Sequence, residues 1–172
     1  MVQTATKPPA EADTANDRLQ VREVVNAAKR EKILRFRDRI MVEERGVEPD
    51  AMSRREQLDQ AARDEAARHL FLTSGKAIAD CLRSYTAEQI PPSDEMNAVY
   101  EPSVLADFDP AYRCFTDHMV IGDRWRGSQA PALMTVAAFK LARSCGAHFD
   151  FTYCPPALVG LYEKIGCRSY SG

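Results

Sequence analysis

Residues 113–131, RCFTDHMVIGDRWRGSQAP, place an apolar stretch directly before a turn that holds a glycine, a serine and two arginines. The stretch 113–121 predicts a strand, and the run 130–145, closed by Gly146, predicts a helix. A helix that directly follows a strand presents unpaired backbone N–H groups and a positive dipole at its N-terminus. The segment therefore predicts either a phosphate site or a plain strand–helix connection.

The rest of the chain alternates strand and helix patterns. A strand is predicted over LQVREVV (19–25), and a helix over 28–45, where Ile33, Phe36 and Ile40 recur at helical spacing before Gly46. The segment 69–86 predicts two strands joined at Ser74 and Gly75. A strand over HFDFTYC (148–154) and a helix beginning at the two prolines 155–156 complete an α/β pattern with a mixed sheet.

Two segments have weaker patterns. Residues 53–68 carry a run of charges that is compatible with a polar helix or a solvated loop. Residues 86–111 contain four prolines and no clear period, which predicts a long irregular segment.

Length and composition limit the possible classes of protein. A chain of 172 residues predicts a single domain over 17–172, and the Ala-, Thr- and Pro-rich residues 1–16 predict a disordered segment. The net charge of −2 gives no electrostatic case for nucleic acid or an anionic membrane. Five widely spaced cysteines, no signal peptide and no apolar run long enough for a membrane span predict a cytoplasmic protein with reduced thiols.

Two motifs resemble those of one enzyme superfamily. Residues 124–129, RWRGSQ, stand in the register of the Arg/Gln-x-x-Gly-x-Gly/Ala turn of the GNAT acyltransferases, and LYEKIG (161–166) resembles their leucine–tyrosine helix motif. Within the superfamily, FRDRIMVEERG (36–46) and DCLRSYT (80–86) look like motifs of bacterial N-acyl amino acid synthases, which are related to acyl-homoserine-lactone synthases. The turn departs from the pattern at Gln129, where a small residue is usual.

The resemblance implies a mixed, mostly antiparallel sheet flanked by helices. The superfamily sheet continues through a sixth and a seventh strand, whereas this chain ends at CRSYSG (167–172). The domain is therefore expected to lack its last one or two strands. Either the sequence is a fragment, or a partner chain or second copy supplies the strands that cover the sheet edge, or the domain is degenerate.

The resemblance also implies the donor and its site. The co-substrate would be a 4′-phosphopantetheine thioester, on coenzyme A or on an acyl-carrier protein, and no metal would be needed. Strand backbone would pair with the pantetheine amides, and the turn with its arginines would bind the phosphates. The residues in these positions are Met119, Val120, Ile121, Arg124, Arg126, Gly127, Ser128, Gln129 and Ala130.

Acyl transfer to an amine needs a base for the amine and an acid for the leaving thiolate. By resemblance the acid is Tyr162; the alternative is a tyrosine that packs with Leu158 and Leu161. The base candidates are Asp117 and His118, which strict strand alternation would place on opposite faces, so that only one of them reaches the amine.

Other side chains could hold the acceptor, a small molecule with an amine. Glu43 and Glu44 could grip or deprotonate the amino group, and Arg37 and Arg83 could bind a carboxylate or serve as structural ion-pair partners. Phe115 stands where the lactone-synthase branch has an acidic residue, which weakens the interpretation of this chain as a lactone synthase. Cys154, at the end of a strand, is interpreted as a packing residue rather than a nucleophile.

The sequence thus predicts an N-acyltransferase that acts on an amino acid or a similar amine. A catalytically inactive module that binds an acyl carrier or a partner protein is the alternative, favoured by the missing strands and Gln129. Transfer from an aminoacyl-tRNA is disfavoured because the chain has no basic stripe.

Overall fold

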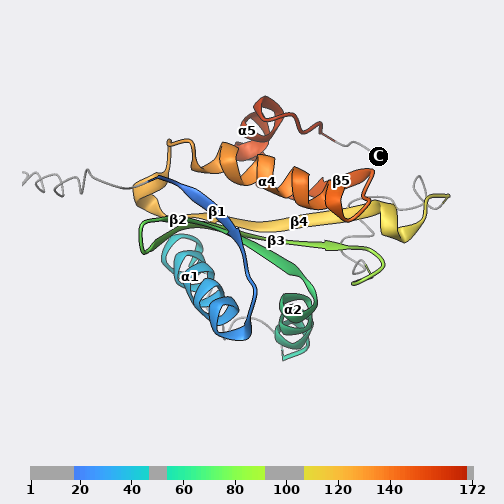
Figure 1. The fold of residues 1–172 in the computed structure, drawn as a ribbon, viewed down its shortest axis with the longest axis horizontal. Helices are drawn as coiled ribbons and strands as arrows, with labels where there is room; N and C mark the ends of the chain where they lie inside the picture. The colour runs from blue at the N-terminus through green and yellow to red at the C-terminus, as the bar shows by residue number, and fades with distance from the viewer. Residues whose placement is uncertain (1–17, 47–53, 92–106, 170–172) are drawn as a thin grey trace, which may run out of the picture.

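The computed structural model describes residues 18–46, 54–91 and 107–169, which contain one five-stranded sheet (Figure 1). The strands lie in chain order, and the first three pairings are antiparallel while the last is parallel. They are β1 (Gln20–Glu23), β2 (Arg68–Ser74), β3 (Ala77–Thr86), β4 (Arg113–Ile121) and β5 (Phe149–Thr152).

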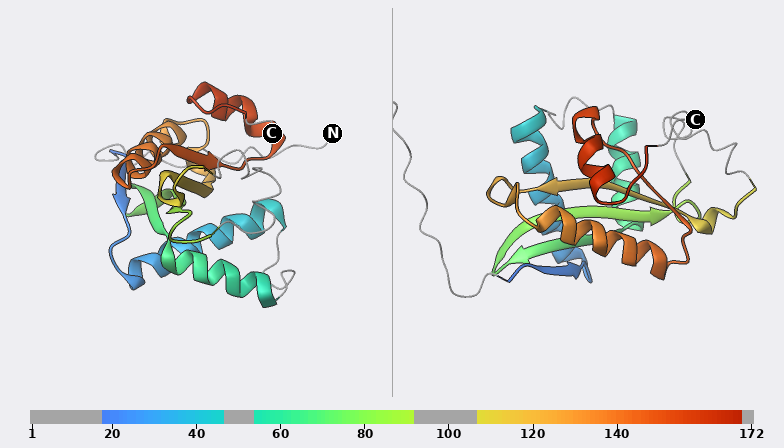
Figure 2. Two further views of the ribbon diagram at one scale, coloured as in Figure 1. Left: turned by 90° about the vertical axis from the view of Figure 1, so that its right-hand side faces the viewer. Right: turned by 90° about the horizontal axis from the view of Figure 1, so that it is seen from above.

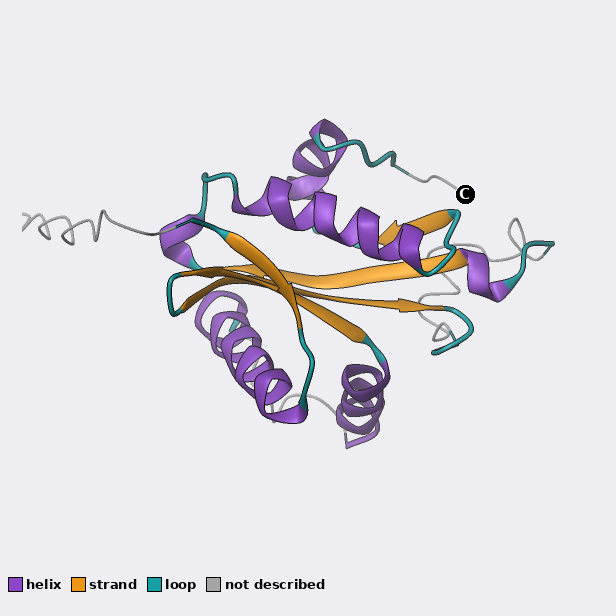
Figure 3. Ribbon diagram, viewed as in Figure 1, coloured by secondary structure: helices purple, strands orange, loops and turns teal. Residues whose placement is uncertain are grey.

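Helices cover both faces of this sheet, as Figures 2 and 3 also show. One layer holds α1 (Ala27–Arg45) and α2 (Arg54–Ala66), and the other holds α4 (Ala130–Ser144) and α5 (Val159–Lys164). Short 3₁₀ turns precede β4, α4 and α5: η3 (Pro110–Tyr112), η4 (Asp123–Trp125) and η5 (Pro156–Leu158). The predicted fold class, a mostly antiparallel mixed sheet between helices, is confirmed. The segments 1–16 and 92–106 lie outside the described residues.

The first helix has the boundaries that its sequence predicts. Asn26 accepts a hydrogen bond from the backbone N–H of Lys29 at 2.9 Å, and Gly46 ends the helix in the left-handed region (φ 58°) with its N–H bonded to the carbonyl of Val42. The apolar positions of α1 pack against Phe71 and Cys81 of the sheet in a cluster that includes Ile33, Phe36 and Ile40.

The opposite face of the sheet packs against α4. Ala130, Met134, Ala138 and Leu141 of the helix lie against Leu70, Leu72 and Leu82 of the strands. Burying each leucine or methionine side chain of this cluster contributes about 1.5–3 kcal/mol to the free energy of unfolding. The two clusters fix β2 and β3 as the rigid centre of the molecule.

Strands β4 and β5 separate part of the way along. Their pairing runs from Arg113 with Phe149 to Thr116 with Thr152, whereas β4 continues as far as Ile121. Beyond Thr116, β5 no longer covers that edge of β4 with backbone hydrogen bonds. The edge is open at the point where the strand approaches the turn 122–129.

Helix α2 resolves the ambiguity of the charged run 53–68, which is a polar helix. Among the described side chains of α2, Asp64 is the buried one. Its carboxylate accepts two hydrogen bonds from Arg37 of α1, at 2.7 and 2.8 Å, and one from Arg83 of β3 at 2.9 Å. Burial opposes ionisation, but the hydrogen bonds and charges of the two arginines lower the pKa of Asp64 below its usual range. The ion pairs therefore anchor α2 to the sheet.

We expect Asp64→Asn to lower the free energy of unfolding by about 3–5 kcal/mol, because it leaves two buried guanidinium groups without their shared carboxylate. Asp38→Asn is the matched control: Asp38 pairs with the same Arg37, but its side chain is 57% exposed, so the loss should stay within about 1 kcal/mol. Urea denaturation of the variants measures both values. Equal losses would show that burial of the pair is not what matters.

Candidate functional site

A β-bulge interrupts β4 at His118. Cys81 pairs with Val120 and Arg83 with Asp117, so two steps along β3 span three along β4. His118 has φ 54°, a left-handed conformation that is uncommon for a residue with a Cβ atom. Strained residues of this kind are frequent at functional sites.

The bulge brings Asp117 and His118 to the same face of the sheet. Nδ1 of His118 lies 3.0 Å from Oδ1 of Asp117, and also 3.3 Å from Nη2 of Arg83. The expectation that the two side chains point to opposite faces is therefore wrong, because strict alternation fails where an extra residue enters the strand.

The contacts of His118 define its hydrogen-bonding roles. Oδ1 of the ionised Asp117 can only accept a hydrogen bond, and it lies closer to Nδ1 of His118 (3.0 Å) than Nη2 of Arg83 does (3.3 Å), so Nδ1 is best satisfied by donating its proton to Oδ1. Nε2 is then an acceptor, and it lies 3.3 Å from Nε2 of Gln60 on α2. An imidazole held by a carboxylate in this way is the arrangement of a general base.

Asp117 itself is firmly ionised. Burial would raise its pKa, but hydrogen bonds from His118 and Arg83 and the charge of Arg83 hold that pKa well below the usual range. A carboxylate this acidic is a poor base, so its part in the cluster is to orient His118.

Arg37 and Arg83 are both occupied by protein carboxylates. Arg37 forms a two-point contact with Asp64, and Arg83 forms one with Asp117 through Nε and Nη2, both at 2.8 Å. The side chain of Arg83 is 2% exposed. Of the two roles that the sequence left open, the structure shows the ion pair.

Tyr162 lies on the other side of the sheet. It is half-buried on α5 and forms a hydrogen bond with Thr152, the last paired residue of β5. Burial is the main cause that raises the pKa of Tyr162 to about 12, so its phenol is protonated at neutral pH. Leu158 and Leu161, its predicted packing partners in the alternative reading, are 39% and 38% exposed.

The turn between β4 and α4 keeps a few backbone donors available. Gly127 has φ 73°, which a residue with a Cβ atom rarely adopts. The hydroxyl of Ser128 accepts from the N–H of Ala130 at 3.1 Å, and the N–H of Ser128 bonds to the carbonyl of Trp125. The N–H groups of Gly127 and Gln129 take part in none of the hydrogen bonds found among the described residues, so these are the donors that the turn can offer.

The two arginines of the turn already have protein contacts. The guanidinium of Arg124 lies over the ring of Trp125, 5.6 Å from its centroid, and Nη1 of Arg126 lies 2.9 Å from Oδ1 of Asp123. Both side chains are exposed, and Asp123 offsets part of the positive charge that the sequence predicted here.

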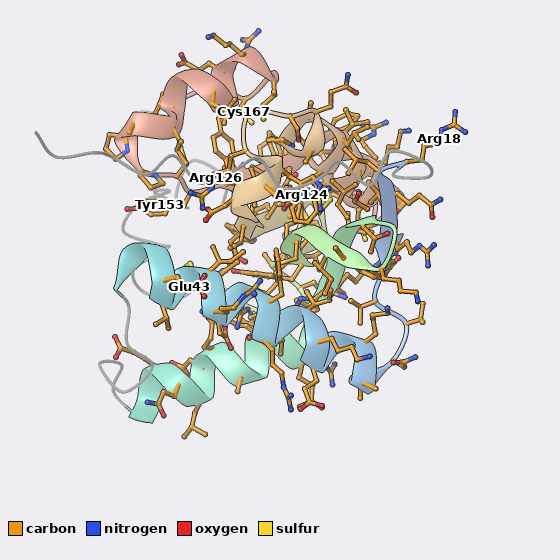
Figure 4. The ribbon with its side chains drawn as sticks, turned by 90° about the vertical axis from the view of Figure 1, so that its left-hand side faces the viewer. Arg18, Glu43, Arg124, Arg126, Tyr153 and Cys167 are labelled. Carbon is orange, nitrogen blue, oxygen red and sulfur yellow. The ribbon has the colours of Figure 1, made fainter. Side chains whose placement is uncertain are left out.

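Glu43 lies on the same side of the molecule as the turn. Figure 4 shows Glu43 at the end of α1, with Arg126 and Tyr153 above it. Glu43 is exposed and Tyr153 is 70% exposed, immediately after β5. The side chain of Glu44 lies outside the described part of the chain.

The remaining strand and cysteine predictions concern less polar positions. Met119 and Ile121 are half-buried and Val120 packs with α1; all three lie on the part of β4 beyond Thr116, where the pairing with β5 has ended. Cys154 is half-buried, and burial raises its pKa, which does not favour a reactive thiolate.

Sequence reasoning missed Asp80 on β3. It is fully buried, and neither carboxylate oxygen forms a hydrogen bond of good geometry among the residues that the structure describes, although the backbone N–H of Cys81 lies close enough to lower its pKa. Burial raises its pKa to about 8. The signal was present in the sequence: Asp80 shares a strand face with Leu82, and an acidic residue is unusual at such an inward position.

Gln60 and Asp64 were also missed, because a charged helix gives no sign of which polar side chain points inward.

Within the described ranges, no three His, Cys, Asp or Glu side chains gather closely enough to hold a metal ion. None of the helices in these ranges is both long and apolar enough to cross a bilayer.

No protein-family model and no curated protein matches the chain. Solved structures do match. A GCN5-related N-acetyltransferase from Ralstonia eutropha JMP134 superposes with a TM-score of 0.63 at 15% identity, covering 90% of this chain and 95% of that one. A predicted acetyltransferase with acetyl-CoA from Clostridium acetobutylicum gives 0.62 at 13% identity, with 89% and 92% covered.

A third structure, glucosamine-6-phosphate N-acetyltransferase from Arabidopsis thaliana, gives a TM-score of 0.57 at 14% identity and covers 90% of this chain and 96% of its own. At these identities the likeness concerns architecture. The chain has the fold of the GCN5-related N-acetyltransferases, the GNAT superfamily.

Proposed function

We propose that the protein is an N-acyltransferase that moves an acyl group from a pantetheine thioester to the amine of a small molecule. The observation that carries the proposal is the bulge at His118, which places an imidazole and its orienting carboxylate beside the open edge of β4. The acyl-thioester would lie along that edge, between His118 on one face and Tyr162 on the other.

His118 acts as the general base. Asp117 holds the Nδ1 proton, so Nε2 accepts a proton from the attacking amine. Nε2 of Gln60 contacts this nitrogen at 3.3 Å, and the acceptor amine takes its place. Glu43, exposed at the end of α1 on the side of the molecule that carries Arg126 (Figure 4), would attract an ammonium group by its charge.

The amine nitrogen forms a bond to the thioester carbonyl carbon, and the carbon–sulfur bond of the resulting tetrahedral intermediate then breaks. Backbone N–H groups on the open edge of β4 stabilise the oxyanion. Tyr162 donates its phenolic proton to the leaving thiolate, a role suited to a phenol that burial keeps protonated.

The donor carries a phosphopantetheine arm, and the N–H groups of Gly127 and Gln129 bind its phosphate at the N-terminus of α4. Coenzyme A and an acyl-carrier protein share this arm. The similar structure from Clostridium acetobutylicum contains acetyl-CoA, which supports a donor of the coenzyme A type. The resemblance of 36–46 and 80–86 to N-acyl amino acid synthases supports an amino acid as acceptor and keeps a carrier protein as an alternative donor.

We expect His118→Gln to lower kcat by about 100-fold or more, because the amine loses its base, while the Kd for coenzyme A changes little. Steady-state rates with acyl-CoA and a panel of amino acids and other primary amines measure the first quantity, and calorimetric titration measures the second. An equal rate for the variant would remove His118 from the mechanism.

Tyr162→Phe should lower kcat by about 100-fold and leave donor affinity within about twofold, because the phenol acts on the leaving thiolate rather than on the bound donor. Thr152→Val is the matched control, since it removes the hydrogen bond that orients the phenol but keeps the phenol itself. A Tyr162→Phe variant that loses donor affinity and turnover equally would point to a packing role.

Gly127→Asp should weaken coenzyme A binding by about tenfold or more, because it strains a left-handed position and adds a negative charge beside the phosphate. Gly146→Asp is matched to it: this glycine also has a positive φ (80°) and open space around it, but it lies at the other end of α4. The coenzyme A-dependent rise in Tm compares the two. No rise with the wild-type chain would favour the inactive binding module over the enzyme.

A further inference from the structure

Asp80 is the most anomalous polar group in the described structure. A buried carboxyl without a hydrogen-bond partner costs about 1–3 kcal/mol, and native proteins rarely tolerate one without a functional reason. Burial raises the pKa of this carboxyl to about 8, which favours its neutral form at pH 7. A neutral carboxyl can both donate and accept a hydrogen bond, as an amide does.

The position of Asp80 connects it to the donor site. On β3 it pairs with Ile121, the last residue of β4, and the neighbouring carbonyl of Ala79 accepts a hydrogen bond from Gly122 at the start of the turn. Strand alternation places Asp80 on the same face as Leu82, the face that α4 and α5 cover.

Tyr162 approaches the same place from α5. The carboxyl of Asp80 is one of the groups that raise the pKa of the phenol, so the two side chains lie within electrostatic range of each other. Next to Asp80, α4 packs on β3 through Ala130 and Met134, whereas α5 has six residues and its neighbours Leu158 and Leu161 are more than one-third exposed.

We propose that Asp80 is a donor-binding residue whose missing hydrogen-bond partner is an amide group of the pantetheine arm. The inference rests on the proposed function, since it takes the open edge of β4 as the path of the arm. The arm would run between the turn and Tyr162 and bring its amide to the carboxyl, with the N-terminal end of α4 and α5 shifting to admit it. The stability that Asp80 costs the empty protein is then recovered when the donor binds.

Three ligands and two variants test the proposal. Calorimetric titration of the full chain with coenzyme A, 4′-phosphopantetheine and adenosine 3′,5′-bisphosphate separates contacts to the arm from contacts to the nucleotide, which has no arm. Asp80→Leu removes the hydrogen bond at similar volume, and Asp80→Asn keeps a neutral group that donates and accepts.

We expect Asp80→Leu to bind coenzyme A and 4′-phosphopantetheine about fivefold to tenfold more weakly, as befits the loss of one hydrogen bond, and to bind the nucleotide unchanged. Asp80→Asn should stay within about twofold of the wild type for all three. Without ligand, Asp80→Leu should unfold at a higher temperature than the wild type, because the unpaired polar group is gone.

Either of two results would overturn the proposal. An Asp80→Leu variant that binds both arm-containing ligands as tightly as the wild type does would show that the carboxyl destabilises the fold without contacting the arm. A variant that unfolds at a lower temperature without ligand would mean that Asp80 already has an internal partner. If the wild-type chain binds none of the three ligands, the proposed function itself fails, which is a distinct outcome.

Discussion

The guanidinium group of Arg83 is the interaction on which the rest of the site depends. It lies in the centre of the sheet, 2% exposed, and bridges the carboxylates of Asp64 on α2 and Asp117 on β4. A buried cation must be neutralised, so its two partners are fixed in place as well. Asp117 in turn holds His118. The position of a helix and the orientation of an imidazole therefore both follow from one charge on β3.

The bulge in β4 joins this charge cluster to the proposed site. An extra residue in the strand turns His118 toward Asp117, and beyond it β4 runs on without β5. The polar groups are thereby sorted by face: His118 lies with α1 and α2, whereas Tyr162 and Asp80 lie with α4 and α5. A thioester on the strand edge between these faces would meet a base from one side and an acid from the other, so that the two proton transfers need not interfere.

Local pattern in the sequence was enough for most of the fold. The strand 113–121 has its predicted bounds, and the helices predicted over 28–45 and 130–145 lie at Ala27–Arg45 and Ala130–Ser144. Apolar spacing and the terminal glycines Gly46 and Gly146 act through neighbouring residues, which is why these elements could be predicted. The relation of Asp117 to His118 could not be predicted, since a bulge depends on the register with β3 and not on β4 alone. Likewise, the choice between ion pair and ligand contact for Arg37 and Arg83 required Asp64, which no local signal distinguishes from the other charges of α2.

Helix α2 has a consequence for how such a protein can change over time. It is held by ion pairs at Asp64 and presents Gln60 to the imidazole, while most of its other described side chains are exposed, Leu58 at 61%. Mutations along its outer surface leave both apolar clusters of the sheet untouched. Under the proposed function, selection for a new acceptor could therefore act on α2 with little penalty to folding, so that substrate range and conformational stability could evolve separately.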